Sequence, residues 1–571
     1  MRWALGIAAV LLLSGCLSGG RGSDDPADGG QQGGPTDPDA DLPADATLAQ
    51  TGRWLAPFDG EVPAVNMVLL HNGRILYWSG VEADPGDGST DLTLVTAAPL
   101  NASSRVLDLS GATPLVLEPI NPDGAGSDLF CAGQTVLPDG TVLAVGSSEW
   151  STNPIMEPFL HGGTDARIYD PVANAWARKA DMAFGRWYPS LITLPDGRAL
   201  VASGIGSLTN PDQQWPQMET YDAATDTWTY YEGGDRLLPL YPRITVVPQG
   251  DSGGLPPGVF YNTLGTLWGP FGEHPRQAEW STQALLDLVA TTTPWSDQGQ
   301  SVFGARQHGS SVMLPLVEGE SPRFVNFGGT IYQSVVAIPF TETVDLATSP
   351  PTNAIGEAMA FPRWHHNGVL LPTGEILAVG GGLYDNVVVH GQQNIPVLDA
   401  ELYDAEAGTW TTLAAMTVPR MYHSTALLLP DGRVLAGGHV PLPNPSKDLR
   451  GSVNPQIAET RLEIFEPPYL FRGDRPVIRS GPTEVSYGEF YDVDVAGDVT
   501  RFVLMRAGAT THAYDSDQRS IQLHTVFNGD AESVRMPVDP YAAPPGWYML
   551  FAIADGADGP VPSVASWVHL G

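Results

Sequence analysis

The feature of this sequence that most limits its fold is a repeated segment, in which two apolar runs flank a tight turn and the second run closes on small residues. An apolar run, a Gly-containing turn and a second apolar run predict a β-hairpin. The clear copies are VNMVLLHNGRILYWSG from Val65, GQTVLPDGTVLAVGS from Gly133, PSLITLPDGRALVASG from Pro189, HNGVLLPTGEILAVGG from His366 and RMYHSTALLLPDGRVLAGG from Arg420. With 64 Gly and 51 Pro in 571 residues, the chain is expected to be turn-rich and all-β.

Two degenerate copies fill the gap between Gly197 and Gly374. They are YPRITVVPQGDSGGLPPGVFYN, whose turn is at Gly250, and GSSVMLPLVEGESPRFVNFGG from Gly309. Three copies are followed by a Tyr-Asp…Trp strand, namely YDPVANAW, YDAATDTW and YDAEAGTW. Seven units of kelch-repeat length predict a seven-bladed, kelch-type β-propeller over residues 51–470.

The rest of the chain divides into a leader, a tether and a second folded part. Residues 471–571 contain short strands such as FYDVDVAG, TRFVLMRAG and GWYMLFAIAD, which predict a small immunoglobulin-like β-sandwich. Residues 17–50 are acidic and rich in Gly, Pro and Asp, so we expect a disordered tether. Residues 1–16, MRWALGIAAVLLLSGC, have the pattern of an export signal.

The end of this leader, Leu13-Ser14-Gly15-Cys16, resembles a bacterial lipobox. That resemblance implies lipidation of Cys16 and an extracytoplasmic, membrane-anchored lipoprotein of a bacterium, periplasmic or at the cell surface. A plain secretory peptide is the alternative. The formal net charge of −36 argues against nucleic-acid binding and against membrane association by charge, so the lipid anchor is the expected membrane contact.

Equivalent positions in successive blades of a propeller lie on a common ring around its axis. The ninth residue before each turn glycine gives such a ring, with Gly309 assigned to the fifth blade by matching SSVMLP to STALLLP. Its members are Ala64, Cys131, Tyr188, Tyr241, Gly309, His365 and His423, and Tyr422 stands beside the last. A lone histidine or tyrosine at a strand start is more often structural, but a thiol, phenols and imidazoles on one ring suit a copper(II) site with N and O ligands.

Cys131 is the single cysteine of the predicted folded part, so no internal disulfide is possible. Such a thiol is either buried and inert or chemically used. The sequence at this point leaves both possibilities open.

Several motifs resemble those of the galactose oxidase and glyoxal oxidase group of copper radical oxidases, over nearly the whole predicted folded chain. They are Asp128-Leu129-Phe130-Cys131-Ala132-Gly133, Arg186-Trp187-Tyr188-Pro189-Ser190, Arg420-Met421-Tyr422-His423-Ser424, and Thr511-His512 before Asp517-Gln518-Arg519. The resemblance implies a seven-bladed propeller followed by a β-sandwich, one loop of which delivers His512 to the axis.

The same resemblance implies one copper ion with four ligands, listed here as Tyr188, Tyr422, His423 and His512. It also implies a thioether between Cys131 and Tyr188 that forms a radical cofactor. Tyr422 would act as general base on the substrate hydroxyl, and the Tyr188 radical would take hydrogen from carbon. Dioxygen would accept both electrons and leave as hydrogen peroxide.

This sequence matches the substrate-binding residues of the group less completely than it matches the motifs of the copper site. Gly206 stands where the group has a stacking tryptophan, which leaves Trp187 or Trp150 to shield the radical. The segment Leu240-Tyr241-Pro242-Arg243 resembles glyoxal oxidases more than galactose oxidases, and no carbohydrate-binding module precedes the first blade in this sequence. We therefore expect small aldehydes, as hydrates, or primary alcohols as substrates, with a pocket formed by Tyr241, Arg243, Trp364, His365 and His366.

An alternative function is a non-catalytic kelch propeller lipoprotein that binds glycans or proteins at the cell surface. Retention of Cys131, Tyr188, Tyr422, His423 and His512 favours the oxidase. We expect a monomer whose partners are a small substrate and O2.

The leader generates a first prediction, that Cys16→Ser releases the protein from membranes or leaves it unprocessed, because stable anchoring by lipid needs acyl chains that only Cys16 can carry. Membrane fractionation with detection of the processed N-terminus checks this. Normal processing together with unchanged membrane association of the variant would refute the lipoprotein assignment.

Overall fold

The computed structural model describes residues 44–79, 100–122, 129–150, 160–207, 214–250, 254–266, 268–269, 272–273, 279–290, 294–331, 334–385, 395–439, 459–527 and 532–571. Cys16, the predicted tether up to residue 43 and Asp128 lie outside these ranges. Strands dominate the described chain, and its helical elements are short: α1 (Ala44–Thr51), α2 (Leu100–Ser103), η3 (Glu279–Ser281) and η5 (Pro468–Phe471). None of the helices described is long and apolar enough to cross a membrane.

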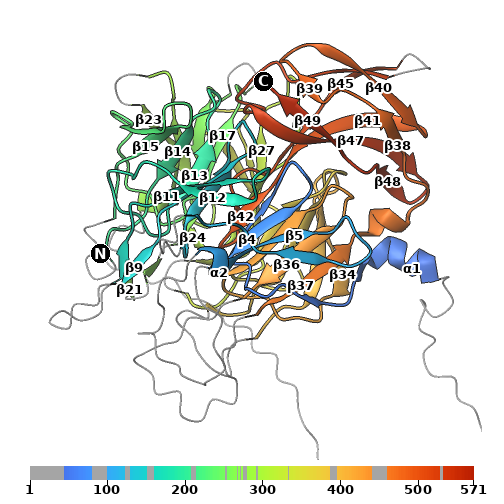
Figure 1. Cartoon of the computed structure of the whole chain (residues 1–571). Coiled ribbons are helices and arrows are strands. Elements are labelled where there is room, and N and C mark those ends of the chain that lie inside the picture. The colour runs from blue at the N-terminus through green and yellow to red at the C-terminus, as the bar shows by residue number, and fades with distance from the viewer. Residues whose placement is uncertain are drawn as a thin grey trace, which may run out of the picture. The chain divides into compact units, whose positions relative to one another are not determined.

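Among the described residues, seven antiparallel sheets follow one another along the chain, each built around a predicted hairpin. Figure 1 shows the course of the chain through these strands by colour. The first sheet contains β3 (Asn66–Leu69), β4 (Ile75–Trp78), β5 (Ser104–Asp108) and β6 (Leu115–Leu117). The second contains β7 (Gly133–Val136), β8 (Val142–Val145), β11 (Ala166–Asp170) and β12 (Ala175–Arg178). The third contains β13 (Ser190–Thr193), β14 (Ala199–Ala202), β15 (Glu219–Asp222) and β16 (Thr227–Tyr230).

The later sheets keep this pattern. The fourth contains β17 (Ile244–Val247), β18 (Gly258–Tyr261), β22 (Thr282–Leu286) and β23 (Trp295–Gln300). The fifth contains β25 (Ser310–Met313), β27 (Arg323–Phe327), β29 (Thr341–Asp345) and β30 (Thr352–Ile355), and the sixth β31 (Asn367–Leu370), β32 (Ile376–Val379), β33 (Asp399–Asp404) and β34 (Thr409–Ala415). The seventh contains β35 (Ser424–Leu428), β36 (Val434–Gly438) and β37 (Arg461–Glu466), against which the early strands β1 (Arg53–Trp54) and β2 (Phe58–Asp59) pair.

The first strands of these sheets are buried along their whole length in all but a few positions, so their sequences do not alternate between apolar and exposed polar residues. Small additional ladders connect the sheets. They are β9 (Ser148–Trp150) with β10 (Leu160–Gly162), β19 (Leu264–Gly265) with β24 (Arg306–Gln307) and β28 (Thr330–Ile331), and β20 (Trp268–Gly269) with β21 (Gly272–Glu273). Each of these sheets contains one of the predicted hairpins, while the number of propeller blades and their closure into a circle stay predictions.

The C-terminal residues form two packed sheets, as expected for a sandwich. One sheet contains β39 (Glu484–Val485), β41 (Val499–Arg506), β44 (Arg519–Gln522), β47 (Gly546–Gly556), β48 (Gly559–Pro562) and β49 (Ser566–Leu570), and the other β38 (Val477–Ser480), β40 (Phe490–Ala496), β45 (His524–Phe527) and β46 (Glu532–Arg535). Phe502 and Leu550 of the first sheet pack with Val493 and Val534 of the second in a buried core. The proposed boundaries at residues 50 and 470 stay predictions.

The motif Asp517-Gln518-Arg519 attaches the sandwich to several of the seven sheets. The Asp517 carboxylate accepts from Val136 N (2.8 Å) in β7, and Gln518 bonds the backbone of Leu370 (2.9 Å) and Gly368 in β31. Arg519 donates to Val246 O in β17. The strand β26 (Leu316–Val317) also pairs in parallel with β44. Three neighbouring side chains thus reach three different sheets.

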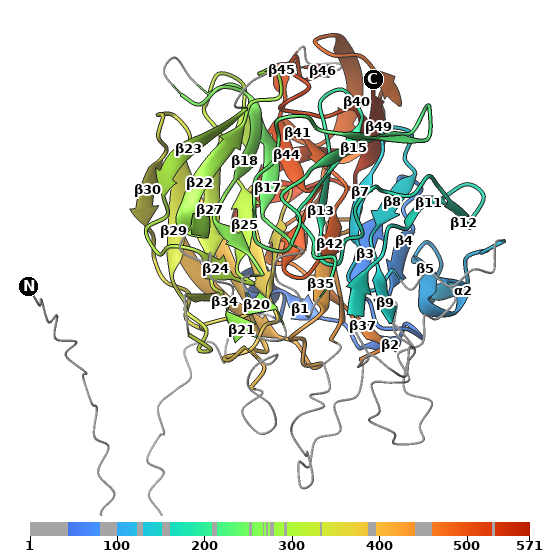
Figure 2. The same ribbon diagram turned by 90° about the vertical axis from the view of Figure 1, so that its left-hand side faces the viewer.

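A second hairpin of the sandwich reaches further into the seven-sheet body. It consists of β42 (Ala509–Thr511) and β43 (Tyr514–Asp515), and β42 pairs antiparallel with β3, with Asn66 opposite Thr511. Figure 2 shows β42 beside β3. This insertion carries His512, one of the two residues between the strands, to the level of the ring positions.

The buried contacts of Asp517 generate a second prediction. Its carboxylate also accepts from Thr135 Oγ1 (2.9 Å) and lies 3.6 Å from Arg506 Nε, with both side chains nearly fully buried. Asp517→Ala leaves a buried cation and a buried N–H without their acceptor, so we expect a loss of about 3–5 kcal/mol of unfolding free energy. Asp494, whose ion pair with Arg479 is exposed, is the control, and Asp494→Ala should cost less than about 1 kcal/mol. Denaturant unfolding measures both; equal costs would contradict the docking role.

Candidate metal centre

Residues at the ring positions share an unusual backbone conformation. The φ angles are 57° at Cys131, 62° at Tyr188, 43° at Tyr241, 56° at His365 and 67° at His423. Residues other than glycine pay of order 1–3 kcal/mol for this left-handed region, and such strain persists where the surroundings impose it. The ring is also linked through its backbone, because Tyr188 N donates to Cys131 O (3.3 Å) and Tyr241 N donates to Tyr188 O (2.9 Å).

The fifth ring position is His308, one residue before the predicted Gly309. His308 has a φ of 49°, and His365 N donates to its carbonyl at 3.0 Å, as Tyr241 N does to Tyr188. The sequence alignment had matched the serines of SSVMLP and STALLLP, whereas aligning Pro315 with Pro430 places His308 opposite His423. The prediction of Gly309 was therefore wrong by one residue, and it concealed a buried histidine.

Buried ion pairs support the turns that lead into the ring. Arg186 pairs with Glu219 (2.9 Å), Arg306 with Glu342 (3.2 Å), Arg363 with Glu401 (2.7 Å) and Arg420 with Glu463 (3.4 Å), and all these side chains are almost completely buried. Each arginine precedes its ring residue by two or three positions. Arg363 and Arg420 also donate to the carbonyls of Gly380 and Gly438 at the ends of the second strands. These bonds fix the peptide that presents the ring side chain.

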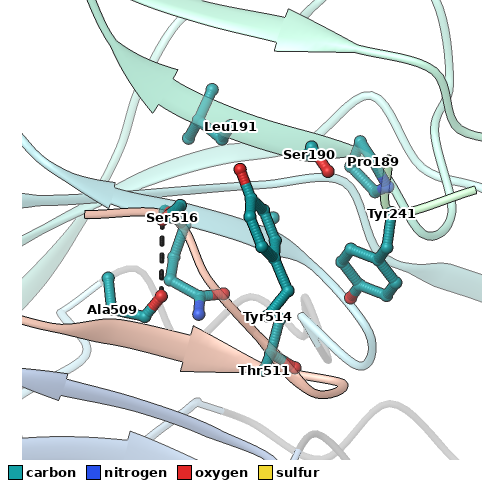
Figure 3. A pocket seen from close by; sticks show the side chains of 10 residues that line it. Pro189, Ser190, Leu191, Tyr241, Ala509, Thr511, Tyr514 and Ser516 are labelled. Atoms are coloured by element: carbon teal, nitrogen blue, oxygen red, sulfur yellow. Dashed lines mark hydrogen bonds between the residues drawn. The ribbon is translucent and has the colours of Figure 1, made fainter. Parts of the chain in front are cut away.

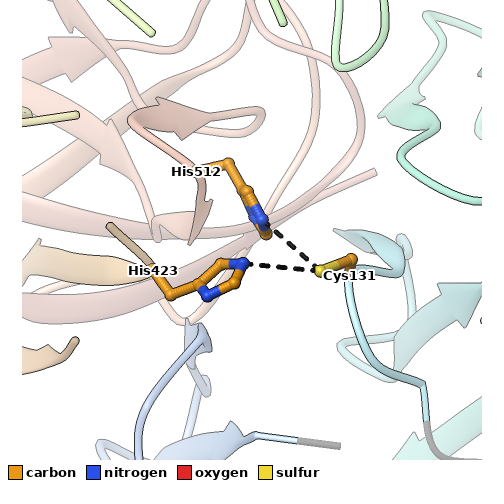
Figure 4. A group of neighbouring side chains, drawn as sticks. All are labelled: Cys131, His423 and His512. Carbon is orange, nitrogen blue, oxygen red and sulfur yellow. Dashed lines mark hydrogen bonds between the residues drawn. The ribbon is translucent and has the colours of Figure 1, made fainter. Parts of the chain in front are cut away.

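Three potential metal ligands converge from different parts of the chain, as Figure 4 shows. Cys131 Sγ lies 3.6 Å from His423 Nε2 and 3.5 Å from His512 Nε2, and the three ligand atoms lie within 4.8 Å of one another. All three residues are buried. Cys131 precedes β7, His423 precedes β35, and His512 comes from the sandwich hairpin, so only the assembled fold brings them together.

Two phenols lie beside these ligands. The Tyr188 and Tyr422 hydroxyls form a short hydrogen bond with each other, and the Tyr422 ring lies 3.8 Å from the His423 ring, centroid to centroid. Trp364 stacks on Tyr422 at 5.6 Å and 23°. Trp187 approaches Tyr188 edge-on at 3.8 Å and 67°, whereas nothing is described of the Trp150 side chain. Trp215 packs against Gly206.

Burial sets the protonation states at the centre. Burial raises the pKa of the Tyr188 and Tyr422 phenols well above its usual value, and neighbouring thiol and phenol groups raise it further at Tyr188. Burial lowers the pKa of the His512 imidazole well below its usual value, with further lowering by the charges of the surrounding histidines. The site thus holds a neutral imidazole, the form that binds metals, and phenols that must lose a proton to bind one.

The residues predicted to form the substrate pocket have different surroundings. Tyr241 stacks on His512 (4.5 Å, 28°), and His365 lies 4.9 Å from Tyr422. Arg243 is fully buried and donates to the carbonyls of Tyr241 (2.8 Å) and His512 (2.7 Å). Arg243 therefore lies next to His512, and its hydrogen bond supports the His512 backbone. Its part in a substrate pocket stays a prediction.

Trp364 and His366 complete that predicted set. Trp364 also contacts His308 at 5.1 Å, so it belongs to the aromatic surroundings of Tyr422. His366 packs on Phe327 (5.1 Å), and neither of its ring nitrogens has a hydrogen-bond partner among the described residues. The structure therefore brings Tyr241, Trp364 and His365 to the centre, while the ring contacts of His366 are with the fifth sheet.

A small cavity adjoins the centre on the sandwich side. Its volume is about 10 Å³, and its lining includes Gln134, Ser190, Tyr241, Thr511 and Tyr514 (Figure 3). A space of this size holds at most about one water molecule. It is too small for a substrate, but its polar lining continues to Thr511, whose hydroxyl contacts His512.

The side chains at the centre fit a copper ion. Two imidazole nitrogens and two phenol oxygens form the mixed N and O donor set that copper(II) accepts in tetragonal geometry. The Cys-His-His triad alone would also suit a metal, so Cys131 has two chemical possibilities, as a ligand or as a partner of Tyr188. The contacts of Cys131 Sγ with the Nε2 atoms of His423 and His512 are compatible with both of these roles.

Comparisons with known proteins agree with this chemistry. Residues 305–469 match the family model "Glyoxal oxidase N-terminus", and residues 475–570 match "Galactose oxidase-like, Early set domain". A galactose oxidase of Gibberella zeae is 27% identical over 91% of this chain and 70% of its own length. An aldehyde oxidase of Vitis pseudoreticulata, GLOX, is 29% identical over 82% of this chain and 86% of its own.

A solved structure shows the same fold. A fungal alcohol oxidase of the AA5 family, in complex with copper, superposes with a TM-score of 0.69 at 23% identity, covering 91% of this chain and all of the other. The fold is therefore galactose oxidase-like, with an early-set, immunoglobulin-like C-terminal domain. These matches confirm the resemblance to the galactose oxidase and glyoxal oxidase group that the sequence motifs indicated.

The geometry generates a third prediction, that the chain binds one copper ion and that His512→Ala loses most of it. At free copper of about 100 times the Kd, binding to the folded state stabilises it by about 2.7 kcal/mol, which should raise the Tm of the wild type but not of the variant. Metal analysis and calorimetry measure both. His71, stacked on Trp547 away from the centre, supplies the control His71→Ala, which should keep copper. Full copper occupancy in His512→Ala would show that the ligand set is wrong.

Proposed function

We propose that this chain, a relative of the galactose oxidases and glyoxal oxidases, is a copper-dependent oxidase that oxidises small aldehydes, as hydrates, or primary alcohols with O2 and releases H2O2. The single observation that carries the proposal is the convergence of Cys131, His423 and His512 beside the Tyr188–Tyr422 pair. Curated relatives named galactose oxidase and aldehyde oxidase support the reaction class.

Copper would be held by Tyr188, Tyr422, His423 and His512. When bound, it would take up one electron while the radical form of Tyr188 takes up the second, so that the centre accepts two electrons in all. His423 and His512 would give their Nε2 lone pairs. Both phenols would give up a proton, against the effect of burial on their pKa values.

Cys131 would be joined to Tyr188 by a thioether. In that reaction the thiol loses its hydrogen, an aromatic C–H of Tyr188 loses its hydrogen, and a C–S bond forms, which removes two electrons and two protons. Dioxygen accepts them and becomes H2O2. Both residues belong to one buried cluster with Tyr241 and Trp187, so the thiol and the phenol share surroundings from which water is excluded. An electron-donating sulfur lowers the potential at which the phenol is oxidised.

Tyr422 would accept the proton of the substrate hydroxyl at its Oη. Its hydrogen bond to Tyr188 shows that this oxygen faces the centre, and the Trp364 ring covers its face. Trp187 covers the edge of Tyr188 in the same way, and both tryptophans are almost fully buried. Such aromatic cover excludes water, which protects a reactive phenol and strengthens the electrostatic interactions nearby. Shielding of the radical by Trp187 is part of the proposal.

A small substrate is supported by two features. The aldehyde oxidase relatives share up to 29% identity with this chain. At Gly206, where the group has its stacking tryptophan, an added Cβ would meet Trp215 at 2.9 Å, so the structure has no room there for a larger side chain without movement. We further propose that the protein acts outside the cytoplasm as a lipid-anchored protein, on the basis of the sequence around Cys16.

A fourth prediction tests the function. Purified, copper-loaded protein should consume O2 and form H2O2 in equal amounts with methylglyoxal or simple primary alcohols, measured with an oxygen electrode and a peroxide assay. Copper-loaded Cys131→Ser should keep its copper and lose nearly all turnover, because sulfur is not a ligand in this proposal. Loss of copper in Cys131→Ser would instead make Cys131 a metal ligand.

Thiol chemistry supplies the matched control. In copper-free protein, denatured Cys131 should react with an alkylating reagent, whereas copper-treated and denatured protein should resist it and give one linked peptide containing Cys131 and Tyr188. A fully alkylatable Cys131 in active, copper-loaded enzyme would rule out the thioether radical. Absence of O2 consumption with every aldehyde and alcohol tested would rule out the oxidase.

A further inference from the structure

The hydroxyl of Thr511 lies between a carbonyl of the seven-sheet body and the imidazole of His512. Thr511 Oγ1 donates to Val65 O at 2.9 Å and lies 2.7 Å from His512 Nδ1. Thr511 and His512 are buried, and the pairing of β42 with β3 holds Thr511 opposite Asn66, next to Val65. The hydrogen bond to His512 therefore forms inside the protein, where solvent does not compete for either partner.

The chemistry of the three groups fixes the direction of both hydrogen bonds. A carbonyl oxygen can only accept, and a threonine hydroxyl has one hydrogen to donate. Because that hydrogen points to Val65 O, Thr511 Oγ1 accepts at its contact with His512 Nδ1. The Tyr241 hydroxyl also lies beside the Thr511 hydroxyl, and it donates its own hydrogen to Ala132 O. His512 Nδ1 is then the nitrogen that carries the hydrogen, and Nε2, on the side of Cys131 and His423, has the free lone pair.

We propose that Thr511 is a positioning residue that selects the metal-binding tautomer of His512, and that Val65 O sets the direction of this selection. This inference rests on the proposed copper site. It adds that the sandwich alone does not present His512 in its metal-binding tautomer. Without Val65 O, Thr511 could donate to Nδ1 and leave the hydrogen on Nε2, the nitrogen that should bind the metal. Docking of β42 on β3 thus prepares the ligand as well as placing it.

The other contacts of His512 do not make this selection. Tyr241 stacks on the ring and Arg243 Nη2 bonds the backbone carbonyl at 2.7 Å, so they fix the ring plane and the peptide. Among the described residues, the hydrogen-bond partner of Nδ1 is Thr511 Oγ1. Hydrogen bonds of this kind to the second nitrogen of a metal-binding histidine usually change metal affinity by about 10–100-fold.

The wild-type protein gives the first test. We expect the 15N spectrum of copper-free, histidine-labelled full chain to show His512 as the Nδ1–H tautomer, assigned by the signal that disappears in His512→Ala. An Nε2–H tautomer for His512 in the wild type would overturn the proposal without the need for any threonine variant.

Variants give the second test. Thr511→Val removes the hydroxyl at nearly constant volume, and we expect copper affinity, measured by competition with a chelator, to fall about 10–100-fold. Thr511→Ser restores the hydroxyl and should restore the wild-type tautomer and affinity. The matched control is Thr425→Val, because the buried Thr425 hydroxyl donates to Ala64 O at 2.7 Å, one residue from Val65, and contacts no imidazole among the described residues.

The outcomes separate this proposal from a merely structural role and from the proposed function. Equal copper affinity in Thr511→Val and wild type, or equal weakening in Thr511→Val and Thr425→Val, would overturn it. If Thr511→Val does not fold, Thr511→Ala and the wild-type tautomer decide. Copper binding with the expected tautomer but no oxidase activity would refute the proposed function while leaving the role of Thr511 intact.

Discussion

The antiparallel pairing of β42 with β3 is the interaction on which the centre depends. It inserts a hairpin of the C-terminal sandwich among the strands of the seven-sheet body and places His512 between Tyr188, Tyr241 and His423. Hydrogen bonds to neighbouring residues offset the conformational entropy that this hairpin loses on ordering. Asp515 Oδ1 accepts the backbone N–H groups of Ala509, Asp517 and Gln518, and Asp517, Gln518 and Arg519 bond to separate sheets. The proposed ligand His512 thus lies on the sandwich hairpin, and contacts with the seven-sheet body align it.

Burial then gives the centre its chemistry. Desolvation favours neutral forms, so it keeps His512 unprotonated and keeps the Tyr188 and Tyr422 phenols protonated in the absence of a metal. A divalent cation reverses the balance for the phenols, because it stabilises a phenolate that burial alone disfavours. Exclusion of water makes the metal-free site unfavourable in free energy, and the same exclusion protects a reactive phenol. The left-handed backbone conformation of the ring residues adds a further unfavourable free energy. The buried Arg–Glu pairs and the backbone hydrogen bonds between sheets offset it.

Much of this could be predicted from local sequence. The hairpins follow from apolar runs around Pro-Asp-Gly turns, and each of the seven predicted units became one sheet. Comparison of equivalent positions found Cys131, Tyr188, Tyr241, His365 and His423, because a repeat in sequence is also a repeat in space. His308 was missed because the fifth unit is degenerate and two alignments, by serine or by proline, differ by one residue. The proline alignment was the available signal, since the turn after the first strand determines the register.

The sequence by itself therefore determined an all-β chain of repeated hairpins with a common ring of thiol, phenol and imidazole side chains, since these follow from periodicity and turn chemistry. His512 was identified from its motif, but its position at the centre was not, because no local pattern specifies which loop of a separate domain reaches the axis. Only the tertiary structure shows the contacts of Arg243 and Thr511. Arg243 donates to the carbonyls of Tyr241 and His512, and its part in a substrate pocket stays a prediction. The proposed direction of the Thr511 hydrogen bond depends on Val65 O. This atom lies 446 residues away in the chain, and it is close in space because β42 pairs with β3.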